Sequence, residues 1–250
     1  MIPAADIAPI AAAGLLAGIV GTAGGITSLV SYPALLAAGL PPFPANLANI
    51  VALSACWPGS ALASKPELEG RGHWLARWML PAAAGGAIGA ALLIFTPSRA
   101  FERIVPFLIA AGAVALLLQP RVSALQQHEA AHRGVVLFTG LVAISAYSGY
   151  FGAGSGVMTL ALMLVAADPH MARANALKNM LIGAATITAA LLVVVFEPVQ
   201  WAAVIPLGIG LFAGSLIGPR VARRLPAALL RWLVAILGLA LAVKLWIAPG

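Results

Sequence analysis

The chain has 250 residues, of which 62% are apolar and 8% are charged, and its mean hydropathy is +1.02. These values exclude an ordinary soluble domain and are typical of a helical protein that crosses the membrane several times. The net charge of +7 does not indicate nucleic-acid binding, because the 14 Lys and Arg residues are scattered, without a basic cluster or an aromatic platform. We therefore expect contact with a lipid bilayer and no nucleic-acid partner.

Apolar runs account for most of the chain. In order, they cover residues 8–40, 46–64, 74–95, 104–119, 134–167, 175–195, 200–218 and 226–248. They are too long for the alternating strands of a membrane β-barrel, which have ~10 residues each. Six of the runs have the length of one membrane crossing. The runs 8–40 and 134–167 would be about 50 Å long as straight helices, against a hydrocarbon core of about 30 Å.

Each of the two long runs contains a glycine-rich stretch at mid-length, GTAGGITS at 21–28 and GAGSGVMT at 152–159. Such a run is either one tilted helix with an interfacial piece or a re-entrant hairpin of two half-helices. The hairpin model places loops 65–77, 120–133, 168–178 and 219–226 on one side. These loops carry ten basic residues, namely Lys65, Arg71, Arg77, Arg121, Arg133, Arg173, Lys178, Arg220, Arg223 and Arg224. Because cytoplasmic loops collect Lys and Arg, we favour the hairpins, with both termini outside.

A hairpin followed by three crossings is an odd unit, so two such units have opposite orientations in the membrane. We predict an all-α membrane protein of two inverted repeats, 1–119 and 134–250, joined by a cytoplasmic linker at 120–133. Each repeat is a re-entrant or broken glycine-rich helical hairpin plus three transmembrane helices. Three glycines of the first long run, Gly18, Gly21 and Gly25, recur at one offset in the second long run as Gly149, Gly152 and Gly156. Inverted repeats with broken helices are typical of secondary transporters.

The broken helices predict an anion site near the middle of the membrane. Irregular backbone at that depth is tolerated where protein buries it or where it lines a cavity. A new helix is expected to begin near Ile26 and another near Val157, and the first N–H groups of a helix carry the positive end of its dipole. Two such ends, with nearby hydroxyl and amide donors, would bind a small anion. The predicted substrate-binding residues are Gly21, Thr22, Gly24, Gly25, Thr27, Ser28, Asn46, Asn49, Gly152, Gly154, Ser155, Gly156, Thr159, Asn175, Lys178 and Asn179.

Two alternatives stay open for these residues. The glycines could serve close helix packing, which is the interpretation we favour for Gly85, Gly89, Gly210, Gly214 and Gly218. Lys178 stands near a helix end, so its amine either snorkels to the membrane surface or faces the site. The seven acidic residues and the four His residues all fall in loops or at segment ends, and no proton relay across the membrane is evident. Export of an anion needs none, because the inside-negative potential favours it.

Several of these motifs together are similar to those of a known family. The segments GTAGGITSLVSYPALLAAGLPP, ANLAN, WPGS, YFGAGSG and ANALKN resemble the TauE/SafE sulfite exporter family, also described as the TSUP anion permeases. The resemblance covers essentially the whole chain. It implies a bacterial-type inner-membrane transporter of anions such as sulfite, sulfoacetate or sulfonates. One departure from a strict repeat is Ser155, which stands where the first half has Gly24.

A channel, an assembly protein and an intramembrane hydrolase are the alternatives to a carrier. A passive anion channel or a membrane assembly protein fits the same composition. An intramembrane hydrolase fits poorly, because Ser155 follows Ala153 where serine-hydrolase motifs require Gly, and no His lies in a crossing segment. The single cysteine, Cys56, excludes an internal disulfide and a cysteine metal cluster. We expect no enzyme activity, metal or cofactor, a small anionic substrate, and either a monomer or a homo-oligomer. The first segment has no basic n-region and is expected to remain in the mature protein.

Overall fold

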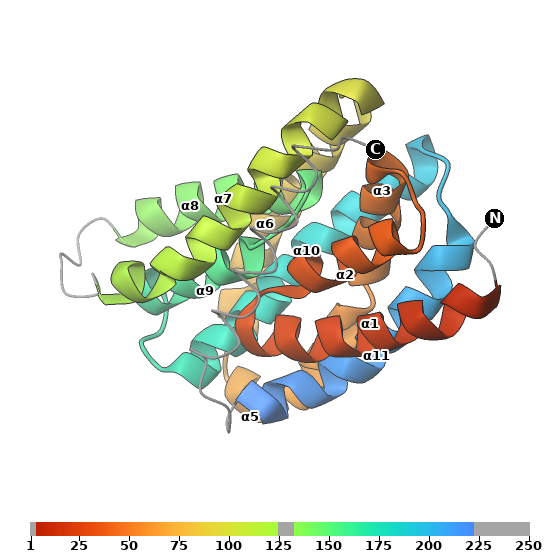
Figure 1. Cartoon of the computed structure of the whole chain (residues 1–250). Helices are drawn as coiled ribbons and strands as arrows, with labels where there is room; N and C mark the ends of the chain where they lie inside the picture. The colour runs from red at the N-terminus through yellow and green to blue at the C-terminus, as the bar shows by residue number, and fades with distance from the viewer. Residues whose placement is uncertain (1–3, 125–132, 223–250) are drawn as a thin grey trace.

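The computed structural model describes residues 4–124 and 133–222, and all of the regular structure in these ranges is helical. The first part contains α1 (Ala4–Gly24), α2 (Thr27–Ala37), α3 (Pro42–Leu53), α4 (Cys56–Ala63), α5 (Lys65–Leu68), α6 (Gly72–Ile94) and α7 (Ser98–Ala124). The second part contains α8 (Arg133–Tyr150), α9 (Ser155–Ala166), α10 (Met171–Phe196) and α11 (Trp201–Ala222), as Figure 1 shows. The predicted all-α fold is thus confirmed.

Four of the described helices are long and apolar enough to cross a bilayer alone. These spans are Asp6–Gly24, Gly72–Ile94, Met171–Phe196 and Trp201–Val221. Shorter apolar helices cover Thr27–Ala37, Gly134–Tyr150 and Ser155–Ala166. The chain therefore has the helices of a protein that crosses the membrane several times. The predicted crossing at 226–248 and most of the predicted linker, residues 125–132, lie outside the described residues.

Both long apolar runs are broken at their glycines, as the sequence predicts. The first run breaks between α1 and α2, where Gly25 has a φ of +83°, a value that L side chains rarely adopt. From this break α2 packs back against α1, and the two helices form a hairpin (Figure 1). The second run breaks at 151–154, where Gly154 has a φ of +77° and precedes α9. Here α9 packs against α8 in the same way.

The run at 46–64 differs from the prediction of one continuous crossing helix, because it is divided into α3 and α4. Ser54 and Ala55 separate the two helices. Pro58, in the first turn of α4, has no N–H to donate to the Ser54 carbonyl four residues earlier. That carbonyl instead accepts a hydrogen bond from the Trp57 N–H at 3.3 Å.

Glycines bring two pairs of helices into close contact. On α1, a Cβ at Gly14 or Gly18 would collide with the backbone of α11. On α6, a Cβ at Gly85 or Gly89 would collide with α8. Small residues allow helix axes to approach closely in membranes, so these glycines serve packing. In the predicted repeat, α8 of the second half corresponds to α1 of the first, and α11 of the second half corresponds to α6 of the first. The α1–α11 contact and the α8–α6 contact are therefore equivalent. This agrees with an inverted repeat, which stays a prediction.

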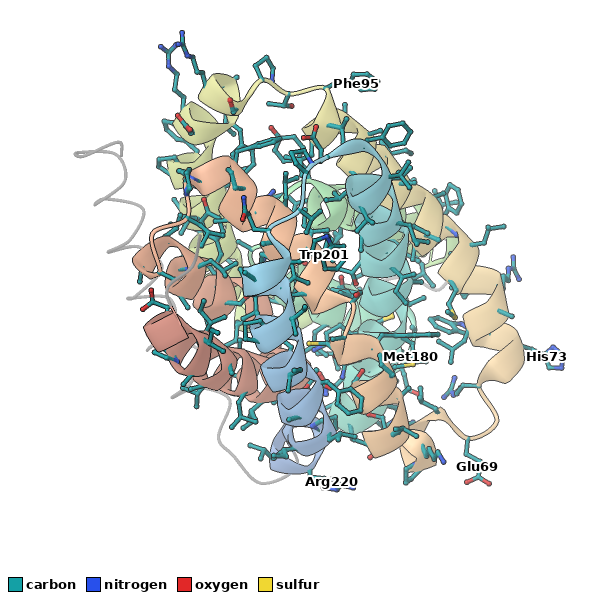
Figure 2. All side chains as sticks on the ribbon, turned by 90° about the vertical axis from the view of Figure 1, so that its right-hand side faces the viewer. Glu69, His73, Phe95, Met180, Trp201 and Arg220 are labelled. Atoms are coloured by element: carbon teal, nitrogen blue, oxygen red, sulfur yellow. The ribbon has the colours of Figure 1, made fainter. Side chains whose placement is uncertain are left out.

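The basic loops gather at one end of the molecule. Figure 2 shows Glu69, His73 and Arg220 at this end and Phe95 at the opposite end. An ion pair of 2.6 Å joins Arg71, before α6, to Asp168, between α9 and α10. The basic segments around 65–77, 168–173 and the start of 219–226 therefore lie together. Lys178, which the charge count placed in a loop of this end, instead lies inside α10 and lines the central pocket. Which membrane face they occupy stays a prediction.

Candidate functional site

The breaks of the two hairpins touch each other in the middle of the molecule. A Cβ at Gly25 would overlap the backbone of Gly156 and Val157, and a Cβ at Gly156 would overlap the backbone of Gly25. Residues 131 positions apart in the sequence, which align in the internal repeat, are thus in direct backbone contact. The N-terminus of α2 and that of α9 consequently meet at one place.

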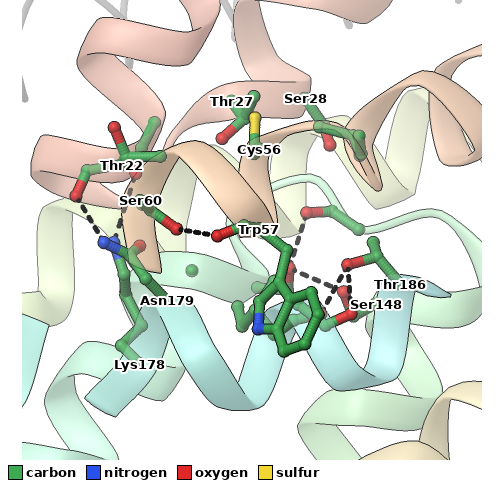
Figure 3. A pocket seen from close by; sticks show the side chains of 18 residues that line it. Thr22, Thr27, Ser28, Cys56, Trp57, Ser60, Ser148, Lys178, Asn179 and Thr186 are labelled. Atoms are coloured by element: carbon green, nitrogen blue, oxygen red, sulfur yellow. Dashed lines mark hydrogen bonds between the residues drawn. The ribbon is translucent and has the colours of Figure 1, made fainter. Parts of the chain in front are cut away.

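A pocket with a volume of about 50 Å³ lies beside this contact. A buried water molecule needs roughly 10–15 Å³ on the same measure, so the pocket has room for a few waters or one small ion. Both hairpin breaks, α4, α8 and α10 contribute to its wall (Figure 3). The lining residues are Gly21, Thr22, Gly25, Thr27, Ser28, Leu53, Cys56, Trp57, Ser60, Ser148, Gly152, Ser155, Gly156, Lys178, Asn179, Ile182, Gly183 and Thr186.

Three polar side chains of α10 donate hydrogen bonds to the end of α1. The last carbonyls of a helix have no intrahelical partner, and lipid cannot supply one. Asn175 Nδ2 donates to the Thr22 carbonyl at 2.9 Å, and Asn179 Nδ2 donates to the same oxygen at 3.1 Å. Lys178 Nζ donates to the Gly21 carbonyl at 3.2 Å. Helix α10 in the second half therefore stabilises the broken end of the hairpin in the first half.

The first half makes a similar contact in return. Asn46 of α3 donates from Nδ2 to the Tyr150 carbonyl at the end of α8, at 2.9 Å. Asn46 and Asn175 stand at the same place in the related segments ANLAN and ANALKN. Each half thus supplies an amide that binds the C-terminus of the other half's first hairpin helix. Asn49 instead accepts a hydrogen bond of 2.6 Å from Ser31 Oγ.

Lys178 faces the interior. Its side chain is 1% exposed and lines the pocket, which decides against snorkelling to the membrane surface. An ammonium has three N–H donors, and the described residues give Nζ one acceptor, the Gly21 carbonyl. No carboxylate of the described residues is in ion-pair contact with Lys178. The amine therefore brings spare donors to the pocket, and a positive charge whenever it is protonated.

Hydroxyl groups line much of the remaining wall. Ser155 Oγ lies 3.2 Å from Ser148 Oγ and 2.9 Å from the Gly152 carbonyl. Thr22 donates to the Gly18 carbonyl within its own helix at 2.6 Å. Thr186, on α10, does the same with the Ile182 carbonyl. Hydroxyls that bond to helix carbonyls can still accept, and they can rotate to donate to a ligand.

The structure brings together only part of the predicted site. The pocket contains the predicted residues Gly21, Thr22, Gly25, Thr27, Ser28, Gly152, Ser155, Gly156, Lys178 and Asn179. The remaining predicted residues, Gly24, Asn46, Asn49, Gly154, Thr159 and Asn175, lie outside its wall. Gly154 packs against Gly112 of α7, and Thr159 Oγ1 donates to the Ser155 carbonyl at 2.9 Å. Asn46, Asn175 and Gly154 contact hairpin ends or a neighbouring helix, whereas Gly24 has open space where a Cβ would be. That these six residues bind the ligand stays a prediction.

The prediction from sequence missed the contribution of α4 to the pocket. Cys56, Trp57 and Ser60 line it, although they follow the break after α3 that the sequence did not reveal. The Trp57 ring occupies the space left by the missing side chain at Gly183 of α10. The WPGS motif at 57–60 was the available signal, because a tryptophan and a proline inside an apolar run are unusual in an unbroken crossing helix. No comparable signal in the sequence marks the other missed lining residues, which are Leu53, Ser148, Ile182, Gly183 and Thr186.

Comparison with known proteins assigns the chain to a family. The profile of the family described as sulfite exporter TauE/SafE matches residues 10–245. The chain belongs to this family. A Sinorhizobium protein named probable membrane transporter protein ORF9 is 29% identical over 241 residues, covering 95% of this chain and 91% of the relative. The probable membrane transporter protein YfcA of Escherichia coli strain K12 is 27% identical over 237 residues, covering 92% and 86%. No solved structure matches.

Family membership and the names of these relatives indicate a membrane transporter rather than an enzyme. The chain is thus an integral membrane protein with the helices that such a function requires. The pocket where the two hairpin breaks meet is its candidate transport site.

Proposed function

We propose that the protein is a carrier that moves small sulfur-containing or organic anions, such as sulfite, sulfoacetate or a sulfonate, across the bacterial inner membrane. The anion binds in the pocket between the two hairpin breaks. The observation that carries this proposal is the buried Lys178 amine beside that pocket, with no carboxylate partner among the described residues. Sulfite is the substrate named by the family description, and export is the direction that it names.

The chemistry of the wall suits an oxyanion. The N-termini of α2 and α9 bring the positive ends of two helix dipoles to the pocket, and Lys178 adds a full charge. Thr27, Ser28 and Ser155 add hydroxyls. An oxyanion accepts several hydrogen bonds at once, so its hydration shell can be replaced by these donors. The small volume favours sulfite or the head of a sulfonate, and a longer organic anion would require the pocket to widen.

Flux into proteoliposomes tests the proposal. We expect uptake of radiolabelled sulfite to saturate with concentration and to show counterflow, because a carrier binds one substrate at a time. Lys178→Ala should raise the half-saturation concentration about 10- to 100-fold, since a hydrogen bond to a charged group contributes about 1.5–3 kcal/mol. Lys65→Ala is the matched control, because Lys65 is exposed at the start of α5 and does not line the central pocket.

The alternatives predict other results. Flux that rises linearly with concentration, without counterflow, would indicate a channel. Folded protein without flux of sulfite or sulfonates would contradict transport of these anions and favour an assembly or binding role. Unchanged half-saturation in Lys178→Ala would remove Lys178 from the site.

A further inference from the structure

Lys178 is a buried charge whose counter-charge the described residues do not supply. Its recorded acceptor is the neutral carbonyl of Gly21, and none of the ion pairs recorded between described residues involves Lys178. Of the seven acidic residues in the sequence, Glu129 alone lies outside those ranges, and it belongs to the predicted linker. Among the described residues, only dipoles would therefore stabilise the protonated amine in the empty pocket.

Such a charge is costly for the empty protein. Taking an ammonium out of water costs several kcal/mol even after the protein relaxes, unless an opposite charge is close. Two events remove the cost: the amine loses its proton, or an anion binds beside it. The neutral amine still has two N–H groups, so it can keep its hydrogen bond to the Gly21 carbonyl after the proton leaves. The geometry therefore accommodates Lys178 in both charge states.

We infer that Lys178 couples the anion to a proton, so that the site takes up one proton for each anion it binds. The inference rests on the proposed function and adds the coupling ion to it. The proton comes from water and adds to the lone pair of the neutral Nζ amine, and the bound anion then faces an ammonium. With a monovalent anion, the loaded pocket has the same net charge as the empty one. The carrier thereby moves no net charge with such an anion, so the membrane potential, which would favour export of the anion alone, does not drive this coupled transport.

The other titratable groups near α10 do not offer this function. Cys56 of α4 lines the same pocket, and its thiol is neutral when protonated, so it supplies no counter-charge to an ammonium. Helices α3 and α9 carry no titratable side chain. The remaining titratable groups with described side chains on α10 and on the helices packed against it lie outside the pocket wall: Asp6, Lys65, Glu67, His73, Arg77, Tyr147, Tyr150, Arg173 and Arg220.

Calorimetry on the purified full-length protein tests the inference. Methanesulfonate and sulfate serve as probes, because both keep a constant charge between pH 6 and 9. Titrations in buffers of different ionisation enthalpy give the number of protons taken up per anion. We expect this number to rise toward one with pH, while the affinity falls about tenfold per pH unit once the empty site is deprotonated. Lys178→Arg keeps its charge, so it should bind without proton uptake and with little pH dependence.

Each other result has a defined meaning. Binding without proton uptake in the wild type from pH 6 to 9 would overturn the coupling and leave the anion site standing. Equal uptake by the wild type and Lys178→Arg would assign the proton to another group. Absence of binding by both probes at every pH would overturn the site and the inference together. Should arginine not fit, Lys178→Gln replaces it, with weak binding and no proton uptake expected. Lys65→Arg is the control and should match the wild type.

Discussion

At the scale of single residues, polar side chains in the membrane act mainly on backbone carbonyls. Asn175 and Asn179 both donate to Thr22, and Asn46 donates to Tyr150. Broken helices are stable in an apolar medium only when such groups are satisfied. Lys178 takes part in the same arrangement but keeps donors to spare. It therefore both stabilises the hairpin and has the donors that the proposed anion site needs.

Asp168 is a charged residue that holds two loops together, at the end of the molecule where the basic loops gather. It is buried, and it forms ion pairs with Arg71 at 2.6 Å and with Arg173 at 2.9 Å. Burial raises the pKa of the Asp168 carboxyl, but hydrogen bonds from His170 and Arg173 and the charge of Arg173 outweigh it, so the pKa lies below its usual value. The cluster thus connects the loop before α6 to the loop before α10.

We predict that Asp168→Asn lowers the stability of the protein by about 1–2 kcal/mol at pH 7, because partly exposed arginines lose their partner. A carboxyl whose pKa is lowered by folding stabilises the protein fully above its unfolded pKa of about 3.9, and this contribution is lost as the pH falls further. Thermal unfolding in detergent should therefore show a constant difference between pH 5 and 8 that shrinks below pH 4. A difference independent of pH down to 3 would contradict the ion-pair account.

At the scale of elements, the two hairpins depend on the direct contact between their breaks. Gly25 combines a positive φ with backbone contact to Gly156, so it tolerates no side chain on two separate grounds. The neighbouring Gly24 has open space where its Cβ would be, and its φ is not positive. A side chain is therefore tolerated at position 24 but not at position 25.

We predict that Gly25→Ala abolishes or severely reduces anion flux, while Gly24→Ala keeps flux near the wild-type level. The alanine Cβ at position 25 would force the hairpins apart and cost about 1–3 kcal/mol through overpacking, with further strain from the positive φ. Proteoliposome flux, normalised to the amount of folded protein, measures both variants. Equal flux from the two would show that the hairpin breaks do not meet as described.

The elements also show how far the sequence predicts this fold. Composition and the lengths of the apolar runs are enough to predict the helices. Two runs that are too long for one crossing, each with glycines at its centre, are enough to predict the hairpin breaks. The break after α3 was missed, because it arises from a missing N–H at Pro58 within a run of normal length. The hydrogen bond from Asn175 to the Thr22 carbonyl was not predicted, because sequence spacing gives the face of a helix and not what lies opposite; ligand binding by Asn175 stays a prediction. Contacts between halves require the three-dimensional arrangement.

At the scale of the whole molecule, the two halves are joined through the centre and along their sides. Helix α1 packs on α11 and α8 packs on α6, while the hairpin breaks touch between these pairs. The candidate pocket is lined by both halves, so a shift of one half relative to the other would change its shape. This arrangement suits alternating access, which the proposed carrier function requires.

The orientation of the molecule in the membrane gives a prediction of its own. We expect the end that contains Glu69 and Arg220 to face the cytoplasm, because the basic residues Arg71, Arg173 and Arg220 lie there, and Phe95 to face outward. Single cysteines at these three positions, in a Cys56→Ser background, can be labelled with an impermeant maleimide. In intact spheroplasts, Phe95→Cys should react while Glu69→Cys and Arg220→Cys should react only after the membrane is opened. The reverse pattern would invert the topology.

The central claim is that an anion binds where the two hairpin breaks meet. Anomalous diffraction from crystals grown with selenite, an oxyanion close to sulfite in shape and charge, tests it most directly. The account predicts a selenium peak in the pocket, within hydrogen-bond distance of Lys178 Nζ and beside the first residues of α2 and α9. A peak elsewhere in the protein, or an empty pocket at selenite concentrations that saturate transport, would contradict it.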